Sequence, residues 1–278
     1  MKNNVFEKID IKVIDAFIDK FAKRYLELRS NLAVNLSGIQ EHSRFKNCGF
    51  DTAYLETIIA KNSVAHDAKR ENGQKPRVLN DIYRSDLGEL LMTYYFEEKL
   101  DKDKRFVIPL KNITYRERFD QPGRGVDTIG YRILDDSIEI LFGEAKVSEQ
   151  QKNPPDVVHA TSDSIYHTQK QYCNDKNAVI QRLTDYCRRL NSEDAAIIGV
   201  AILHLDSANE NCELTLGCSL IRDFSCVDDS KDYGKLKKNI AEFNPHKVHF
   251  SILSFSDKKI EEAVQLFYKK VQELLNNE

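Results

Sequence analysis

Two acidic residues and one lysine of this chain occupy positions from which they can act together. Asp127 lies in the segment Gly125-Val-Asp-Thr-Ile-Gly-Tyr131, and Glu144 and Lys146 close the apolar segment Ile138-Glu-Ile-Leu-Phe-Gly-Glu-Ala-Lys146. An acidic residue in one strand followed by Glu-x-Lys in the next is an arrangement that holds a divalent cation in metal-dependent nucleases. The chemistry that these residue types predict is therefore metal-assisted hydrolysis of a phosphodiester.

The two segments must form a β-hairpin for these side chains to meet. Asp135 and Asp136 lie between two alternating apolar runs, which is the pattern of a tight hairpin turn. With these residues at the centre of the turn, Asp127 lies directly opposite Glu144, and Lys146 projects from the same face of the sheet. The rest of this face is apolar and is predicted to be buried: Ile129, Tyr131, Ile133, Ile138, Ile140 and Phe142.

The setting of Glu144 and Lys146 distinguishes them from other acidic-x-Lys sequences in this charged chain, such as Glu97-Glu98-Lys99. They end an apolar strand, where charged side chains are costly to remove from water unless partners compensate them. Two neighbouring carboxylates in partial burial repel each other, and a cation between them stabilises the pair. The alternative is an ordinary hairpin in which Glu144 and Lys146 reach solvent at the strand end.

The composition is that of a folded protein without an overall basic charge. Of the 278 residues, 41% are hydrophobic and 31% are charged, with a formal net charge of -3. Contact with nucleic acid would therefore have to come from a local patch or a partner. The sequence has no apolar run long enough to span a bilayer, no signal-peptide core and no Cys-x-x-Cys pair among its six cysteines. We therefore expect a cytoplasmic protein with reduced thiols and no membrane contact.

The residues before the hairpin divide into a helical N-terminal region and the start of an α/β body. Amphipathic spacing predicts helices over about Asp10–Arg29 and Thr52–Ala60. The polar stretch Lys61–Pro76, which contains Asn-Gly and a closing proline, predicts a boundary or an exposed loop. We therefore expect a helical region over residues 1–76 and a second domain over residues 77–278.

Helices and strands alternate around the hairpin in the expected second domain. The predicted helices are Val78–Leu100, Ile165–Leu190, Lys231–Phe243 and Asp257–Leu275. The predicted strands are Arg105–Arg116, Ala195–Leu205, Glu213–Ile221 and Val248–Ser254. The continuous apolar run of Ala195–Leu205 is interpreted as a fully buried strand.

This order of elements resembles the common core of the PD-(D/E)xK, or restriction-endonuclease-like, superfamily. The resemblance covers about Val78–Leu205. It implies an α/β fold whose core is a helix, a three-stranded antiparallel meander, a helix and a strand. The N-terminal helices would then be an extension, and the C-terminal residues an α/β addition.

The first helix of that superfamily often carries a glutamate that adds to the metal site, and Glu89 is the candidate in this sequence. At helical spacing Glu89 shares one stripe with Ile82, Ser85, Met92 and Phe96. It therefore occupies a position where an apolar residue would be expected. The alternative is a residue at the edge of the stripe that reaches water.

Three short segments carry a closer resemblance: Gly123-Arg-Gly-Val-Asp-Thr-Ile-Gly-Tyr131, Leu141-Phe-Gly-Glu-Ala-Lys-Val-Ser148 and Leu87-Gly-Glu-Leu90. They are similar to the HamA family, the nuclease subunit of the Hachiman anti-phage defence system. This resemblance implies a protein that cuts or nicks DNA with a divalent metal under the control of a partner helicase, HamB.

The same resemblance implies a role for each site residue. Asp127, Glu144 and Glu89 match the metal carboxylates, and Lys146 matches the catalytic lysine. The Gln-x-x-x-Tyr signature of the RecB-like branch is missing, because Cys173 stands four residues after Gln169. The role of this third helix is therefore left open.

Charge indicates how such a site would act. Mg²⁺ or Mn²⁺ held by Asp127 and Glu144 would activate a water and neutralise the charge that develops on the scissile phosphate. Lys146 would orient or deprotonate that water, or stabilise the pentavalent phosphorane. Mg²⁺ keeps most of its waters when it binds, so a site with few carboxylates suffices.

Further residues are candidates for phosphate contacts. Tyr166, Gln169 and Lys170 fall at the start of the helix that follows the hairpin, where a helix N-terminus attracts phosphate. Arg124 belongs to a basic cluster beside the hairpin, together with Arg116 and Arg118. The alternative for these residues is an ordinary solvated surface.

Two other readings of the whole chain stay open. The first is a catalytically silent scaffold of the same fold that binds DNA or a partner protein without cutting. The second is an unrelated α/β protein in which the charged cluster of the hairpin is a structural ion network. Intact Asp127, Glu144 and Lys146 argue against the silent scaffold, because a module without activity has no need of buried charges.

Overall fold

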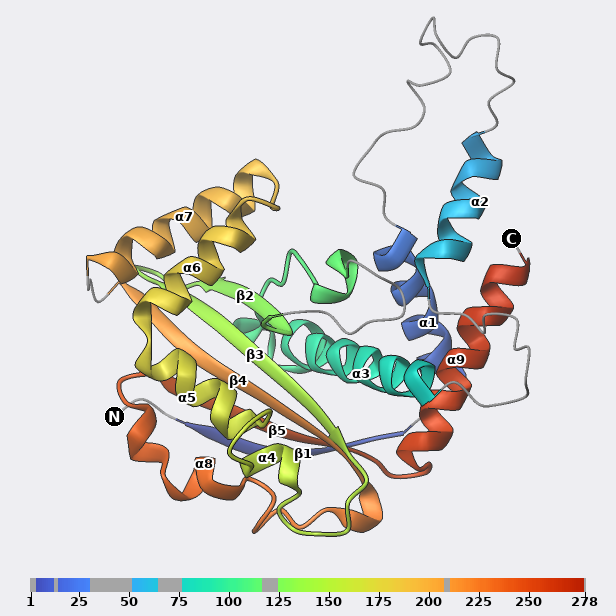
Figure 1. Cartoon of the computed structure of the whole chain (residues 1–278). Coiled ribbons are helices and arrows are strands. Elements are labelled where there is room, and N and C mark those ends of the chain that lie inside the picture. Colours follow the sequence, from blue (N-terminus) through green and yellow to red (C-terminus); the bar gives the residue numbers. More distant parts are fainter. Residues whose placement is uncertain are drawn as a thin grey trace, which may run out of the picture.

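A five-stranded sheet lies at the centre of the protein, with helices on both faces (Figure 1). The computed structural model describes residues 4–12, 15–30, 52–64, 77–116, 125–207 and 211–277. The strands are β1 (Val5–Ile11), β2 (Thr128–Ile133), β3 (Ile138–Ser148), β4 (Cys212–Asp223) and β5 (Lys247–Phe255). They follow the order β1-β5-β4-β3-β2, in which β2 and β3 are antiparallel and the other neighbours are parallel. The fold is therefore α/β, as the sequence predicts.

The predicted hairpin is present in the predicted register. Thr128 pairs with Gly143 at one end of the β2–β3 ladder, and Ile133 pairs with Ile138 at the other. This register extends to Asp127 opposite Glu144, one residue before β2 begins. The buried residues on the expected apolar face join one core cluster: Ile129, Tyr131, Ile140 and Phe142.

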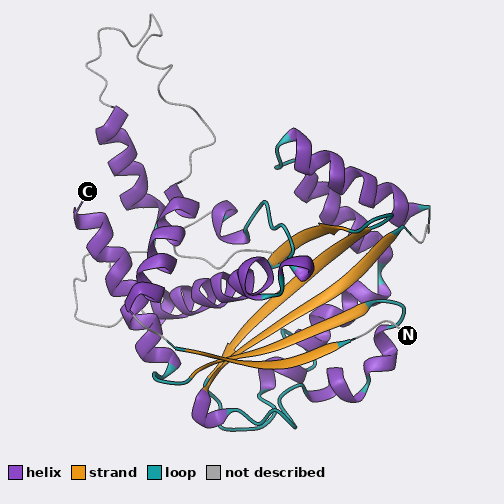
Figure 2. Ribbon diagram, turned by 180° about the vertical axis from the view of Figure 1, so that it is seen from behind, coloured by secondary structure: helices purple, strands orange, loops and turns teal. Residues whose placement is uncertain are grey.

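The first helical layer consists of α1 (Asp15–Ser30), α3 (Arg77–Tyr94) and α9 (Ile260–Asn277), which share one hydrophobic core. Figure 2 shows α3 lying across the sheet, where it contacts β3. One turn of π-helix, Tyr95–Lys99, continues α3, and α2 (Thr52–Ser63) packs against α1. The helices that the sequence predicts in this layer are confirmed.

The opposite layer consists of shorter helices, which are α4 (Asp156–His159), α5 (Ile165–Asn174), α6 (Lys176–Cys187), α7 (Ser192–Asp206) and α8 (Gly234–Lys238). The prediction of one long helix over Ile165–Leu190 is wrong at its centre. Asp175 ends α5, and its side chain accepts a hydrogen bond from the backbone N–H of Ala178 to cap α6. The predicted helix over Lys231–Phe243 is likewise two short pieces, α8 and a 3₁₀ turn over Ile240–Phe243.

The prediction of a buried strand over Ala195–Leu205 is wrong, because these residues lie in α7. Asn191 caps this helix by accepting hydrogen bonds from the backbone N–H groups of Glu193 and Asp194. A continuous apolar run fits a strand buried on both faces, but it also fits a helix with apolar residues on all sides. In α7, Ile198 and Ala201 are buried, whereas Val200 and Leu203 are exposed.

The expected strand over Arg105–Arg116 is also absent, and the three-stranded meander is reduced to a hairpin with two added bridges. Val107 bridges to Tyr131 and Lys111 to Thr128, both antiparallel. Pro109 lies between the two bridging residues and has no N–H with which to continue a ladder. The following residues turn into a short 3₁₀ helix over Asn112–Tyr115.

The N-terminal and C-terminal residues are built into the same sheet as the hairpin. β4 pairs in parallel with β3, and β5 joins β4 to β1, a strand that the sequence reasoning missed. Helix α1 consequently begins at Asp15 rather than at Asp10. The expected boundary at residue 76 lies outside the described residues, while β1 and α1 on its N-terminal side share the sheet and the core of the body.

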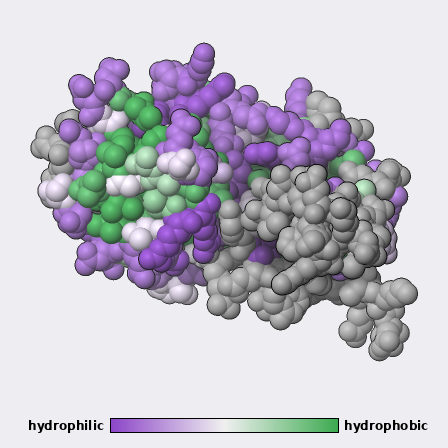
Figure 3. Space-filling view, turned by 90° about the horizontal axis from the view of Figure 1, so that it is seen from above, coloured by the Kyte–Doolittle hydropathy of each residue, from purple (hydrophilic) through white to green (hydrophobic). Residues whose placement is uncertain are grey.

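The outer side of α7 adds an apolar area to the surface. Val200 is 43% exposed and Leu203 is 69% exposed. Figure 3 shows apolar side chains gathered over the end of the molecule that carries α6 and α7. None of the helices in the described residues combines the length and the apolar character that crossing a membrane requires.

Candidate functional site

Asp127 is held at the edge of the sheet, directly before β2 begins. Its Oδ2 atom accepts a hydrogen bond of 2.8 Å from the backbone N–H of Ala145 on β3. The backbone pairing of β2 with β3 ends at Thr128 and Gly143, and beyond it the N–H of Ala145 donates to the side chain of Asp127 instead of to a backbone carbonyl. Strand β3 therefore fixes the position of this carboxylate. The side chain is half-buried.

Glu144 and Lys146 project from the same side of β3, as the sequence predicts. Glu144 is buried, and its Oε1 atom lies 3.2 Å from Nζ of Lys146. The same ammonium lies 2.5 Å from Oδ1 of Asp163, an exposed residue with a φ angle of 48°. Asp163 directly precedes Ser164, which caps α5. The sequence reasoning missed Asp163, because its proximity depends on how the loop after β3 returns to the strand.

Glu89 reaches the site from α3, which two glycines allow to approach the sheet closely. A Cβ atom on Gly88 would lie 2.7 Å from Cγ2 of Val147, and one on Gly143 would lie 3.1 Å from Sδ of Met92. Glu89 is only 4% exposed. Its Oε2 atom is buried and has no hydrogen-bond partner within the described ranges. The predicted stripe on α3 is therefore buried with Glu89 in it.

The electrostatics of the cluster reflect an excess of acid. Burial and the neighbouring Asp127 raise the pKa of Glu144 to about 8, although Lys146 lowers it. Burial raises the pKa of Asp127 to about 6, while the Ala145 hydrogen bond and Lys146 act in the opposite direction. Burial, Asp127 and Glu144 together raise the pKa of Glu89 well above its ordinary value. These three carboxyls thus lie within electrostatic reach of one another with one ammonium beside them.

The cluster is arranged around Lys146 rather than around a single point for a metal. In the part of the chain that the structure describes, no three His, Cys, Asp or Glu side chains are gathered closely enough to hold a metal ion together. Lys146 takes the position of a cation beside Glu144 and Asp163. Mg²⁺ is usually bound through one or two protein carboxylates, so Glu144 and Asp127 are the residues of the cluster that could hold it.

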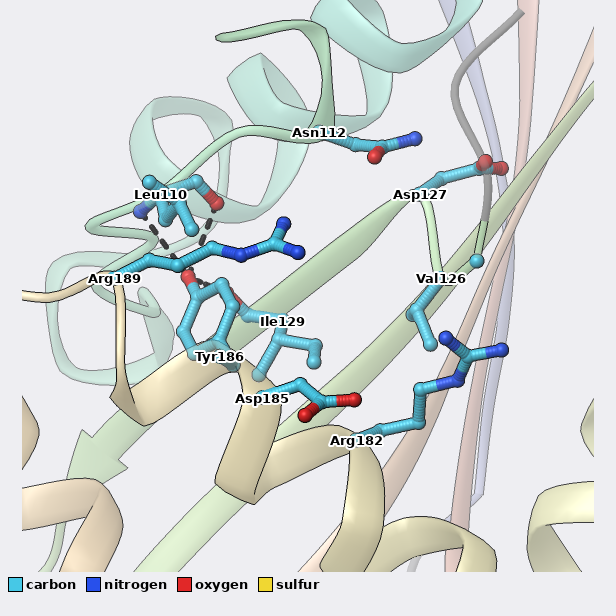
Figure 4. Close-up of a pocket in the computed structure, with 10 residues that line it drawn as sticks. Leu110, Asn112, Val126, Asp127, Ile129, Arg182, Asp185, Tyr186 and Arg189 are labelled. Atoms are coloured by element: carbon cyan, nitrogen blue, oxygen red, sulfur yellow. Dashed lines mark hydrogen bonds between the residues drawn. The ribbon is translucent and has the colours of Figure 1, made fainter. Parts of the chain in front are cut away.

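A pocket of about 100 Å³ adjoins Asp127 between the start of β2 and the end of α6 (Figure 4). Two arginines line it, Arg182 on α6 and Arg189 just after that helix. Gly125, also in the lining, has a φ angle of 105°, and a Cβ atom there would lie 3.2 Å from Nη1 of Arg182. The sequence reasoning missed both arginines. Their separation of seven residues, about two helical turns, could have predicted that they lie on one side of the chain. Such a spacing is weak evidence in a chain with this many charged residues.

The candidates for phosphate contacts occupy other positions than expected. Gln169 is fully buried, and its Nε2 atom donates to the backbone carbonyls of Phe142 and Gly217 at 3.2 and 2.8 Å. This amide therefore ties α5 to the sheet, and its burial argues against the prediction that it contacts phosphate.

Tyr166 and Lys170 project from a different side of α5 than Gln169, and both bind Glu242. The Tyr166 hydroxyl donates to Oε2 of Glu242 at 2.9 Å, and Nζ of Lys170 lies 2.9 Å from the same oxygen. Their role toward nucleic acid stays a prediction. Arg124 and Arg118 lie outside the described residues, and Arg116 is buried in an ion pair with Asp86.

A protein-family model described as HamA matches residues 12–271, which is nearly the whole chain and contains every residue of the cluster. No match is found among curated proteins.

Proposed function

This chain belongs to the HamA family, which indicates a role in Hachiman anti-phage defence, and on this premise we propose that it is a metal-dependent nuclease or nickase that acts on DNA. The observation that carries the proposal is the uncompensated acid of the cluster. Glu89, Asp127 and Glu144 lie within electrostatic reach of one another and have raised pKa values, and the Oε2 atom of Glu89 has no hydrogen-bond partner in the described residues.

We assign the metal to these carboxyls because burying them without a partner is costly. A buried carboxylate that lacks a compensating charge is destabilising, and a divalent cation removes that cost. Asp127 and Glu144 would hold Mg²⁺ or Mn²⁺, and Glu89 would accept a hydrogen bond from a metal-bound water. The bound metal would supply an activated water and positive charge at the scissile phosphate.

Lys146 is positioned to act on the phosphate or on the attacking water. Its ammonium is partly buried and lies between a buried acid, Glu144, and an exposed one, Asp163. Burial by itself would lower the pKa of Lys146, but Glu144 and Asp163 raise it by more than burial lowers it. The pKa of Lys146 therefore lies above its ordinary value, and the side chain is positively charged at neutral pH. A charged lysine suits orientation of the phosphate and stabilisation of developing negative charge.

The order of elements supports a PD-(D/E)xK core for the proposed nuclease. Helix α3, the β2–β3 hairpin, α5 and β4 follow one another, and β4 lies parallel to β3. The proposed core thus ends with β4 instead of the segment that forms α7. From the same family relation we propose a partner helicase of the HamB kind as the control of cleavage.

Cleavage of supercoiled plasmid DNA by the purified protein tests the proposal. We expect nicking with Mg²⁺ or Mn²⁺ and none with EDTA. Glu144→Ala and Lys146→Ala should each reduce the rate by roughly 10²–10⁴-fold, the usual cost of losing a group that acts in proton transfer or charge stabilisation. Glu56→Gln, a change at an exposed acid on α2, serves as the matched control and should leave the rate unchanged.

The outcomes separate nuclease activity from the alternative. Nicking that survives Glu144→Ala would show that this cluster is not the catalytic site. DNA binding without any cleavage in Mg²⁺ or Mn²⁺ would instead favour the catalytically silent scaffold. Co-purification of a helicase with the chain from its native cells tests the proposed control.

A further inference from the structure

Lys146 lies between two acids that the structure holds in different ways. Its Nζ atom is 3.2 Å from Oε1 of Glu144, a buried neighbour on the same strand, and 2.5 Å from Oδ1 of Asp163. The side chain of Asp163 is 88% exposed, and it comes from the loop that leads into α5. A lysine ammonium has three N–H donors and accepts no hydrogen bond, so a donor that binds Asp163 is not available to a phosphate.

The backbone around Asp163 brings this carboxylate to the lysine. Asp163 has a φ angle of 48°, a left-handed conformation that aspartate adopts more readily than most residues. The next residue, Ser164, is fully buried, and its Oγ atom accepts a hydrogen bond from the N–H of His167 and donates one to the carbonyl of Ala160. These contacts tie the loop to the start of α5, so the fold itself places Asp163 against the lysine.

The negative charge of Asp163 also reaches the carboxyls that we propose as metal ligands. Burial is the largest cause of the raised pKa values of Asp127 and Glu144, and Asp163 raises both further because like charges disfavour ionisation. The carboxylate of Asp163 is therefore close to the proposed metal site as well as to the lysine.

The two contacts of Lys146 differ in how easily they open. Glu144 is buried on the same strand, so its side chain has little room in which to leave. Asp163 is exposed, and ion pairs in contact with water add little stability, because water solvates the separated charges well. The oxygens of a DNA phosphate are charged acceptors for an ammonium, as those of a carboxylate are. Of the two acids, Asp163 is thus the one that a phosphate can replace.

We propose that Asp163 is an internal competitor of the substrate: without DNA its carboxylate occupies the place at Lys146 that a phosphate oxygen takes during cleavage, and the bound strand displaces it. The proposal rests on the proposed nuclease function and adds a regulation of the same site. Cleavage at low DNA concentration is then slower than the site could support, whereas cleavage at saturating DNA concentration is unaffected.

The nicking kinetics of Asp163→Asn in Mg²⁺ test this competition. The change removes the charge and keeps the size of the side chain, and asparagine also tolerates the left-handed backbone. We expect KM for plasmid DNA to fall by roughly two- to fivefold with kcat unchanged, because a weak ion pair no longer has to open before DNA binds. Asp163→Gly, which suits the same backbone and has no side chain, should lower KM in the same way.

Asp156→Asn is the matched control for these variants. Asp156 is an exposed acid on α4, the helix before the same loop, and its Oδ1 atom lies 2.6 Å from Nζ of Lys152. The control thus breaks an exposed acid–lysine pair that does not involve Lys146, and KM should stay unchanged.

A double-mutant cycle on DNA binding shows whether Asp163 acts through the lysine. Binding of a fluorescent DNA duplex is followed by anisotropy with Ca²⁺ in place of Mg²⁺, since Ca²⁺ also binds carboxylate and phosphate oxygens. We expect Asp163→Asn to lower Kd by the same roughly two- to fivefold in the wild type and to leave Kd unchanged in a Lys146→Ala background. Thermal denaturation checks that each variant is folded.

Three results would overturn the proposal. Unchanged KM and Kd in Asp163→Asn would show that this carboxylate does not compete with DNA. An equal effect of Asp163→Asn with and without Lys146 would assign the effect to general repulsion of DNA. A lower kcat would mean that Asp163 positions the lysine for cleavage instead of blocking it.

Failure of this proposal is distinguishable from failure of the nuclease. Tighter DNA binding by Asp163→Asn that depends on Lys146, without any nicking, would keep the competition and reject cleavage. Mg²⁺-dependent nicking with equal KM values for Asp163→Asn and the wild type would keep the nuclease and reject the competition. Absence of DNA binding in both proteins would reject the two proposals together.

Discussion

Two acidic residues on α3, Asp86 and Glu89, are almost equally buried, but their surroundings differ. Asp86 is 0% exposed and forms a two-pronged ion pair with Arg116, one of whose bonds, from Nη1 to Oδ2, measures 2.9 Å. Glu89 is 4% exposed and faces two further carboxyls, Asp127 and Glu144. Asp86 has a positively charged partner inside the protein, whereas Glu89 has only other acids beside it.

The compensated arrangement recurs on the other side of the sheet. Arg222 is fully buried, and its Nε atom lies 3.2 Å from Oδ2 of the buried Asp232. Its Nη2 atom also donates to the backbone carbonyl of Gln150 at 2.9 Å, which holds the loop after β3. Pairs of this kind stabilise particular chain geometries. A cluster that lacks its counter-charge lowers stability, and this cost points to a function.

The largest expected difference between the two acids is in stability. Asp86→Asn leaves the Arg116 guanidinium buried without its counter-charge and should lower the free energy of unfolding by about 3–5 kcal/mol. Glu89→Gln replaces a carboxyl whose raised pKa favours the neutral form by an amide of similar shape, and it should leave the free energy of unfolding unchanged or raise it. Urea denaturation in EDTA at neutral pH measures both. A similar loss in the two variants would mean that Glu89 has a stabilising partner and would remove the contrast.

The pH dependence of stability tests the contrast between the compensated pair of Asp86 and the acidic cluster, through Glu144, another acid of that cluster. The pKa of Glu144 is about 8 in the folded protein against an ordinary 4.5, so the folded state holds a proton that the unfolded chain releases. The stability that this proton provides is fully present when the pH is below 4.5, the ordinary pKa of a glutamate, and it is lost as the pH rises toward the folded-state pKa of about 8. In EDTA we therefore expect the free energy of unfolding to fall across this range by a few kcal/mol, since one pKa unit corresponds to about 1.4 kcal/mol.

Two comparisons check the assignment of this slope. Glu144→Gln should flatten the difference between mildly acidic and mildly alkaline pH. Mg²⁺ should restore stability at the alkaline end, because it binds the ionised carboxyls and not the protonated ones. A slope that Glu144→Gln leaves unchanged would assign the pH dependence to other groups.

The smallest effects are expected from the glycines that set the distance of α3 from the sheet. Gly88→Ala places a Cβ atom 2.7 Å from Cγ2 of Val147, a stiff β-branched side chain, so α3 must move. We expect a loss of about 1–3 kcal/mol of unfolding free energy and a lower cleavage rate, because Glu89 moves with the helix. Thermal denaturation and plasmid nicking measure the two effects.

Gly199→Ala on α7 is the matched control. A Cβ atom there meets nothing within 4 Å, so the change should raise the free energy of unfolding by roughly 0.5–1 kcal/mol through helix propensity alone. Cleavage should be unaffected. If Gly88→Ala behaved like Gly199→Ala, the close approach of α3 would not be needed to place Glu89.

Local patterns in the sequence were enough to predict the parts of the site that lie on the hairpin. The alternation of apolar residues and the Asp135-Asp136 turn fix the register, and the register alone places Asp127 opposite Glu144 with Lys146 on the same face. The buried position of Glu89 follows from helical spacing in the same way. These predictions succeed because strand and helix periodicity act between residues close in the sequence.

Predictions that depended on distant partners were wrong or missing. The apolar run of Ala195–Leu205 forms a helix, and the charged segment Val5–Ile11 forms a strand because β5 is available to pair with it. Asp163 and Arg182 join the site through loop and helix positions that are set by packing, and Gln169 turned inward to bind strand carbonyls.

The sequence by itself therefore determined which residues share a face, and the tertiary structure decided which charges meet. Periodicity specifies orientation along one element, whereas burial and pairing depend on the distance between elements. That distance is set here by two glycines, Gly88 and Gly143, which bring α3 against β3. The excess of acid at Glu89, Asp127 and Glu144 exists only once α3 and the hairpin have packed together, because repulsion between carboxyls requires them to be close and shielded from water.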